Sequence, residues 1–286
     1  TEMLAGLTTF MTMVYILMVN ADMFTSTGVS YGAAYIFTAL GAIVGTLLMA
    51  FLAKIPFAQA PGMGLNAFFC FTVCGTLGYS YANALLIVLC SGVLFLILTI
   101  VGARKMIVRS VPTAIRLAIP AGIGLFIAFV GLQQAGIVVN DDSTLVKLVS
   151  FNVLADGFDG FAAMSAAVAL LSLLIIAIFS KLKIKGAVLF GIVGSTVLYY
   201  IFAAIALAVG NTAAKEMFEK IAFDNPLQAF ADFGTQSFGQ AFINGFKGIG
   251  GDKVFDFIAT LVAFAMVDMF DTIGTLMGTC QAAGKE

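Results

Sequence analysis

Long apolar runs alternate with short polar connections along almost the whole chain. Seven uninterrupted runs are long enough for transmembrane helices, which need about 20 apolar residues each. They cover residues 4–23, 31–53, 83–103, 113–135, 160–180, 186–209 and 256–280. An eighth run, 56–76, contains two prolines and has the pattern of a broken helix. The pattern predicts an all-α polytopic membrane protein with about eight transmembrane segments.

Two connections are longer than the others. Residues 136–157 form a short polar excursion, whereas residues 210–255 mix charges, glycines and amphipathic patches such as "AAKEMFEKIAF". Amphipathic segments of this kind are typical of helices that lie at a membrane surface. The longer connection is therefore expected to carry surface helices outside the spans.

The positions of the basic residues indicate which connections lie on the cytoplasmic side of the membrane. Alternate connections hold nine of the fourteen Lys and Arg residues, among them the "ARKMIVRS" connection that follows the fourth span. Basic connections stay on the cytoplasmic side of a membrane. The N-terminus and "ARKMIVRS" are therefore predicted to be cytoplasmic, in a multi-pass protein of the cell membrane. The first residues show no signal-peptide pattern, and the sequence stops soon after the last span, so we interpret the chain as an N-terminal fragment.

Composition supports the membrane class and excludes others. The chain has 286 residues, of which 61% are hydrophobic and 10% are charged, whereas soluble domains are about 25% charged. The net charge of −1 argues against nucleic acid as a partner, which requires a basic surface. The four cysteines show no metal-type spacing, so neither a metal nor a cofactor is predicted. Without histidine, proton handling near neutral pH must fall to carboxylates.

Two carboxylates lie where lipid should exclude them. Of the fifteen acidic residues, only Asp268 and Asp271 of "MVDMFDTIG" fall deep inside a span. A charge at the bilayer centre costs at least about 2.5–3.5 kcal/mol, and such residues usually mark a substrate or ion path. Positions three apart share a helical face, so both carboxylates are expected to point the same way. The alternative is that both carboxyl groups are protonated and serve only as hydrogen-bond donors between packed helices.

The second chemical feature is the stretch "PFAQAPGMGLNAFF", 56–69. Pro61 cannot continue a helix, and the residue before a proline favours extended backbone. We predict an extended piece over 57–61 and then a helix that begins near Gly62 or Met63. Non-helical backbone at membrane depth must be buried in protein or line a cavity. A loop at the membrane edge, followed by an ordinary helix, is the alternative.

A helix that starts inside a membrane presents free N–H groups to a polar ligand. Here the backbone of Gly64 and Leu65 would supply these groups. The amide of Asn66, in the first turn, can donate and accept at once. Asn20, near the end of the first span, is a weaker candidate because it also fits a simple helix cap.

Four stretches carry a resemblance to a known family. They are "AGLTTFMTMVYILMVN", "IPFAQAPGMGLNAFF", "AIPAGIGLFIAFVGLQQAGIV" and "VDMFDTIGTLMG". Together they resemble the AzgA-type branch of the nucleobase–cation symporter 2 group, the permeases for adenine, guanine and hypoxanthine. The resemblance runs along almost the whole chain.

The resemblance implies two inverted seven-helix repeats, in which short strands break the third and tenth helices at the substrate site. On this chain it implies core helices 1–4 in residues 1–103, gate helices 5–7 in 104–209, a connecting segment in 210–255, and helix 8 in 256–286. The chain then ends before the second repeat is complete.

The resemblance also assigns residues. The family's eighth-helix carboxylates fall on Asp268 and Asp271, and its third-helix asparagine falls on Asn66. The tenth-helix glutamate has no counterpart in this sequence.

Residues and resemblance together predict a secondary active transporter, not an enzyme, that imports purine nucleobases by proton symport with alternating access. Asp268 is expected to bind the base or the coupled proton, Asp271 to tune or relay that proton, and Thr272 to complete the site. A xanthine/uracil-type permease and a sodium-coupled transporter of the same group are the nearest alternatives. A channel is disfavoured because polar residues would have to line a continuous pore, and the chain shows one polar cluster. An intramembrane enzyme is disfavoured because paired catalytic carboxylates converge on a substrate from opposite sides, whereas these two project from one face of one helix. The expected partners are the base, the coupled ion, lipid and, as an open question, a second copy of the chain.

Overall fold

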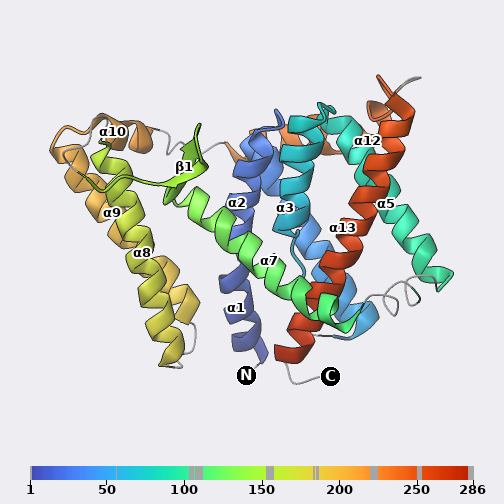
Figure 1. Cartoon of the computed structure of the whole chain (residues 1–286), viewed down its shortest axis with the longest axis horizontal. Helices are drawn as coiled ribbons and strands as arrows, with labels where there is room; N and C mark the ends of the chain where they lie inside the picture. The colour runs from blue at the N-terminus through green and yellow to red at the C-terminus, as the bar shows by residue number, and fades with distance from the viewer. Residues whose placement is uncertain are drawn as a thin grey trace. The chain divides into compact units, whose positions relative to one another are not determined.

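The computed structural model describes the chain except residues 1, 56, 103–105, 107–111, 153–157, 183, 185–186, 220–224, 250–252 and 283–286. The chain divides into two compact units. Unit 1 contains Thr1–Val14 and Ala128–Phe223, and unit 2 contains Tyr15–Ile127 and Asp224–Glu286. Each unit is described by itself below, with the element labels of Figure 1.

Unit 2 holds both features that the sequence singled out. Its elements are α2 (Tyr15–Thr25), α3 (Tyr31–Leu48), the π-helical turn η1 (Met49–Ala53), α4 (Met63–Ala67), the π-helix η2 (Phe68–Thr76), α5 (Tyr81–Ile100), the first part of α7 (Thr113–Gln134), α11 (Pro226–Asp232), η3 (Phe233–Ser237), α12 (Gln240–Ile243) and α13 (Lys253–Ala282). The helices α13 and α5 pack against each other, and α2 packs along α3.

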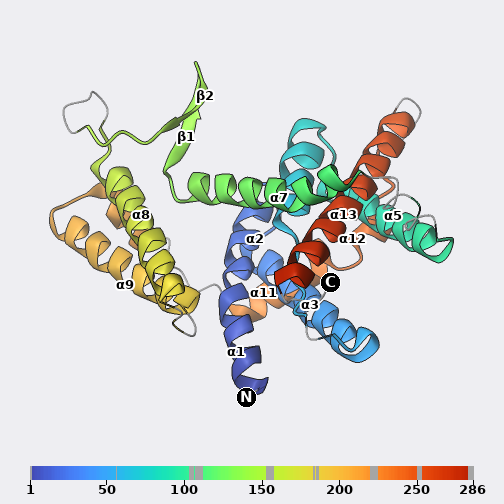
Figure 2. The same ribbon diagram turned by 60° about the horizontal axis from the view of Figure 1, so that its bottom comes forward.

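Unit 1 is built around a helical pair. Its elements are α1 (Glu2–Met13), the end of α7, the strands β1 (Val138–Asp141) and β2 (Leu145–Leu148), α8 (Gly160–Lys181), α9 (Ala187–Ala208) and α10 (Thr212–Glu219). Figures 1 and 2 both show α8 and α9 side by side.

The described residues include five helices that are long and apolar enough to cross a membrane. These are Ala5–Thr25, Tyr31–Ala53, Tyr81–Ile100, Gly160–Lys181 and Phe190–Ala208. They coincide with five of the predicted runs, and α13 occupies the run 256–280 as one continuous helix. The helical membrane class is therefore confirmed, whereas the count of eight spans and the inverted repeat stay predictions.

Several helices begin where a polar side chain can bind free backbone N–H groups. Ser30 caps α3 by accepting from the N–H of Ala33, and Ser80 caps α5 by accepting from the N–H of Asn83. Asp159 caps α8 in the same way. Such caps replace hydrogen bonds that the first helical turn lacks, so polar residues at the ends of apolar runs set the helix starts.

The strands β1 and β2 form an antiparallel hairpin inside the predicted polar excursion 136–157. The all-α prediction missed it because it depends on local turn chemistry. The Asp141 carboxylate accepts from the N–H groups of Ser143 and Thr144 and pairs with Lys147 at 3.0 Å. The Lys147 ammonium and these N–H groups lower the pKa of Asp141 to about 2. The charged form therefore supports the turn above the ordinary Asp pKa, and this support is lost as the pH falls through about 2.

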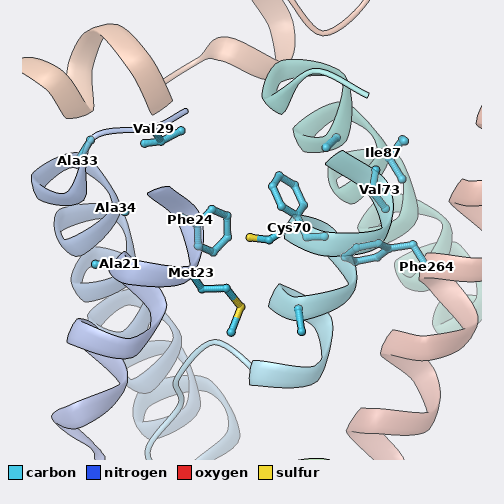
Figure 3. Close-up of a cluster of buried hydrophobic side chains, with 13 residues drawn as sticks. Ala21, Met23, Phe24, Val29, Ala33, Ala34, Cys70, Val73, Ile87 and Phe264 are labelled. Atoms are coloured by element: carbon cyan, nitrogen blue, oxygen red, sulfur yellow. The ribbon is translucent and has the colours of Figure 1, made fainter. Parts of the chain in front are cut away.

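An aromatic and aliphatic core holds unit 2 together (Figure 3). Phe24 of α2 packs edge-to-face on Phe37 and lies 5.3 Å, centroid to centroid, from Phe69. Figure 3 shows Phe24 turned toward Cys70 of η2, while Phe264 arrives from α13. This core fixes α2, η2 and α13 against one another, and with them the polar groups described below.

We predict that Gly191→Ala destabilises the protein, because a Cβ at this position of α9 would overlap the Ile176 side chain of α8. Overpacking of this kind costs about 1–3 kcal/mol. The matched control is Gly194→Ala on the same helix, where nothing lies within 4 Å of an added Cβ. Thermal unfolding of both variants in detergent should show a lower Tm for Gly191→Ala alone, and equal Tm values would contradict this packing.

Candidate functional site

The chain leaves the helical path before α4, as the prolines predict. Residues 57–62 are non-helical, and α4 begins at Met63 with Gly62 as its N-cap in extended geometry (φ −72°, ψ 124°). The predicted helix start is confirmed. The predicted extended piece over 57–61 belongs to no strand in the described part of the chain.

A side chain of α3 replaces the hydrogen bonds that this break loses. The N–H of Gln59 donates to Thr46 Oγ1 at 3.0 Å, and the Thr46 hydroxyl lies 3.3 Å from Gln59 O, to which it donates. Gly45 permits the close approach, since a Cβ there would lie 3.1 Å from the Cβ of Gln59. The break is thereby tied to α3.

Three polar side chains form a hydrogen-bonded chain that ends at the half-buried Asn66. The Asn66 amide donates to Asn20 Oδ1 at 2.5 Å, the Asn20 amide donates to Thr38 Oγ1 at 2.6 Å, and the Thr38 hydroxyl donates to Ala34 O. Asn20 is 2% exposed and Thr38 is fully buried. Asn20 therefore links α2, α3 and α4 instead of capping a helix, and it orients the Asn66 side chain.

Asp268 lines a cavity of about 500 Å³ that the helix break helps to form. The same cavity is lined by four residues of the break and of α4, which are Pro61, Gly62, Leu65 and Asn66. Aromatic side chains complete it, contributed by several elements: Phe24, Phe37, Phe69, Tyr81, Phe233 and Phe264. A carboxylate and an amide among aromatic rings suit a flat ligand that both donates and accepts hydrogen bonds.

Asp271 lies on the other side of α4. It lines a second cavity of about 550 Å³, together with Gly64, Leu65, Phe68 and residues of α7. The two carboxylates thus line two different cavities, and Leu65 lines both of these cavities. Positions three apart on a helix are offset by about 60°, which is enough to place them on either side of a narrow partner helix.

The Asp271 carboxylate also approaches the start of α4 closely. A Cβ added to Gly62 would lie 3.0 Å from Asp271 Oδ2. Gly62 therefore leaves room for the carboxylate at the N-terminal end of the helix. That end carries partial positive charge, so a nearby carboxylate is favoured there.

Thr272 is half-buried on α13 and is not among the residues that line either cavity. Its predicted role in the site stays a prediction. Within the described residues, no group of three or more His, Cys, Asp or Glu side chains could hold a metal ion.

The sequence interpretation missed the contribution of the connecting segment. Phe233, Ser237 and Phe238, in the segment expected to lie at the surface, line the Asp268 cavity. The N–H of Ser30 donates to Gln236 Oε1 at 2.9 Å. The Asn83 amide donates to the carbonyls of Gly245 and Lys247 at 2.7 and 2.9 Å. These partners are more than 150 positions apart in sequence, so no local pattern signals them.

Comparison with known proteins gives a consistent picture. Residues 1–286 match the model described as "Permease family". The chain is 35% identical over 285 residues to the guanine/hypoxanthine permease PbuO of Bacillus subtilis (strain 168), covering 99% of this chain and 59% of that protein. It is 36% identical over 283 residues to the putative permease MJ0326 of Methanocaldococcus jannaschii, covering 99% and 58%.

A third relative, the adenine permease AdeP of Escherichia coli (strain K12), is 31% identical over 284 residues, covering 99% of this chain and 56% of that protein. The chain therefore spans less than two thirds of the length of these curated relatives. All three are named as permeases rather than as enzymes.

Proposed function

This chain belongs to the permease family, and we propose that the protein of which it forms part imports purine nucleobases across the cell membrane by proton symport. The observation that carries the proposal is the Asp268 cavity, where a carboxylate and an amide meet among aromatic walls. The names of the relatives, which specify guanine, hypoxanthine and adenine, support the purine class.

The base lies in the Asp268 cavity in this proposal. A purine edge displays N–H donors and ring-nitrogen acceptors, and a carboxylate accepts from such an N–H. Asn66, held by Asn20, offers its amide, and the start of α4 offers the backbone N–H of Leu65, whereas Gly64 lines the Asp271 cavity. The volume of about 500 Å³ falls within the range of about 300–1,000 Å³ that small-molecule sites occupy.

The coupled proton resides on the two carboxylates in this proposal. Asp268 faces the base and Asp271 faces the second cavity, with Gly62 and Leu65 between them. The two carboxylates leave neighbouring positions of the same helix, so a proton can pass between them in this proposal. Asp271 then tunes or relays the proton that accompanies the base.

Alternating access follows from the arrangement that the resemblance implies. Residues 1–103 and 256–286 belong to the core, residues 104–209 belong to the gate, and the gate rocks against the core around the site. The N-terminus lies in the cytoplasm, on the strength of the Lys and Arg pattern. Sodium coupling and a xanthine/uracil substrate range are the alternatives within the family.

Asp268→Asn in the complete protein should abolish accumulation of radiolabelled hypoxanthine. The loss of a charge-assisted hydrogen bond, worth about 1.5–3 kcal/mol, weakens base binding by about tenfold or more, and the coupled proton loses its carrier. The control is Asp256→Asn, the same change at an exposed position in the first turn of α13. Normal uptake by Asp268→Asn, at wild-type membrane levels, would overturn the assignment.

Gly62→Ala should lower the initial uptake rate by about tenfold or more, because a displaced reacting group costs far more than the contact itself. The added Cβ moves the Asp271 carboxylate, while the backbone of Gly62 already suits any residue. Gly41→Ala on α3, with nothing within 4 Å of its Cβ, is the control. If both variants transport equally well, the position of Asp271 at Gly62 has no role in transport.

Proton coupling makes a separate prediction. A protonophore should collapse hypoxanthine accumulation, and an inwardly directed proton gradient should drive it in proteoliposomes that contain the complete protein. Accumulation sustained by a sodium gradient alone would show that the coupling ion is sodium.

A further inference from the structure

Ser237 differs from the other buried polar side chains in the described part of the chain. These side chains belong to Asn20, Thr38, Asn83, Ser91, Ser237 and Thr260. Five of them donate a hydrogen bond: Asn20 to Thr38, Thr38 to Ala34, Asn83 to Gly245 and Lys247, Ser91 to Val88, and Thr260 to Asp256. Within the described residues, Ser237 shares one hydrogen bond, with the Tyr81 hydroxyl.

The one hydrogen-bonding neighbour of Ser237 among the described residues is a weak partner. The Tyr81 hydroxyl, on α5, donates to Ser237 Oγ at 3.5 Å. Hydroxyl hydrogen bonds are normally about 2.7–2.8 Å long. Ser237 is only 9% exposed, so its hydroxyl is withdrawn from bulk solvent and this long contact is its one hydrogen bond within the described residues. A buried hydroxyl whose one partner is this distant costs free energy, and such a group in a folded protein calls for a reason.

The surroundings of Ser237 point to a ligand as that reason. Ser237 lines the same cavity as Asp268 and Asn66, and the aromatic side chains of Tyr81 and Phe233 line that cavity too. It closes η3, where the N–H of Phe238 donates to Phe233 O at 2.9 Å. The neighbouring Gln236 is bound to the N–H of Ser30, so the wall that carries Ser237 is fixed.

We propose that Ser237 is a base-binding residue, which donates its hydroxyl proton to an acceptor atom of the ligand in the Asp268 cavity. The acceptor is a ring nitrogen or a carbonyl oxygen of a flat heteroaromatic base. This proposal rests on the proposed function and deepens it. An ionised carboxylate can accept a hydrogen bond but cannot donate one. Asp268 therefore accepts from an N–H of the base, while the Ser237 hydroxyl donates to an acceptor atom of the base. The connecting segment thus helps to decide which bases are accepted.

The test uses the complete protein in cells that lack their own purine uptake, with radiolabelled hypoxanthine as the probe. Ser237→Ala should raise KM about three- to tenfold, the effect of one neutral hydrogen bond, and leave Vmax and the membrane level unchanged. Ser237→Thr, which keeps the hydroxyl, should remain within about twofold of the wild-type KM. Thr235→Ala is the control, because its exposed hydroxyl donates to Ala231 O within the same segment.

Competition by hypoxanthine analogues, each lacking one acceptor atom, identifies the atom of the base that accepts from Ser237. It also distinguishes this contact from a structural effect of the substitution, which would weaken all analogues equally. The Ser237→Ala penalty should vanish for one analogue and persist for the others. An equal penalty for every analogue, or an unchanged KM in Ser237→Ala, would overturn the role of Ser237. Wild-type protein that takes up no purine would overturn the proposed function itself, and with it this proposal.

Discussion

A chain in a membrane can leave the helical path only where other groups replace the hydrogen bonds that the helix supplied. In this protein the Thr46 hydroxyl meets that requirement at the break, where it binds both the N–H and the carbonyl of Gln59. The chain of Asn66, Asn20 and Thr38 then holds the start of α4 against α2 and α3. The rest of the site depends on this anchoring, because α4 separates the two cavities.

The break determines what the two carboxylates of α13 can do. Asp271 approaches the N-terminal end of α4 because Gly62 has no side chain, and Asp268 looks into the cavity bounded by Asn66. Asp271 approaches a helix start, which favours negative charge, whereas Asp268 is half-buried in a cavity lined by aromatic rings. Two acids one turn apart therefore occupy unlike environments. Unlike environments are what distinct roles in binding and proton transfer require.

The aromatic core and the cavity walls share residues. Phe24 and Phe69 pack against each other and against Tyr81, and the same three rings line the Asp268 cavity. The packing that stabilises unit 2 therefore also fixes the cavity walls. The connecting segment closes another side of the cavity, and its attachment to Ser30 and Asn83 shows that a polar connection can be part of a site.

The sequence by itself determined the helical membrane class, the break at Pro61, the helix start at Met63 and the presence of two acids inside an apolar helical run. Each of these follows from local physics: the length of an apolar run, the missing N–H of proline, and the cost of charge in lipid. Only the tertiary structure decided that Asp268 and Asp271 face different cavities, that Asn20 supports Asn66, and that Ser237 reaches the site. These outcomes depend on contacts between residues far apart in the chain, which no local periodicity encodes.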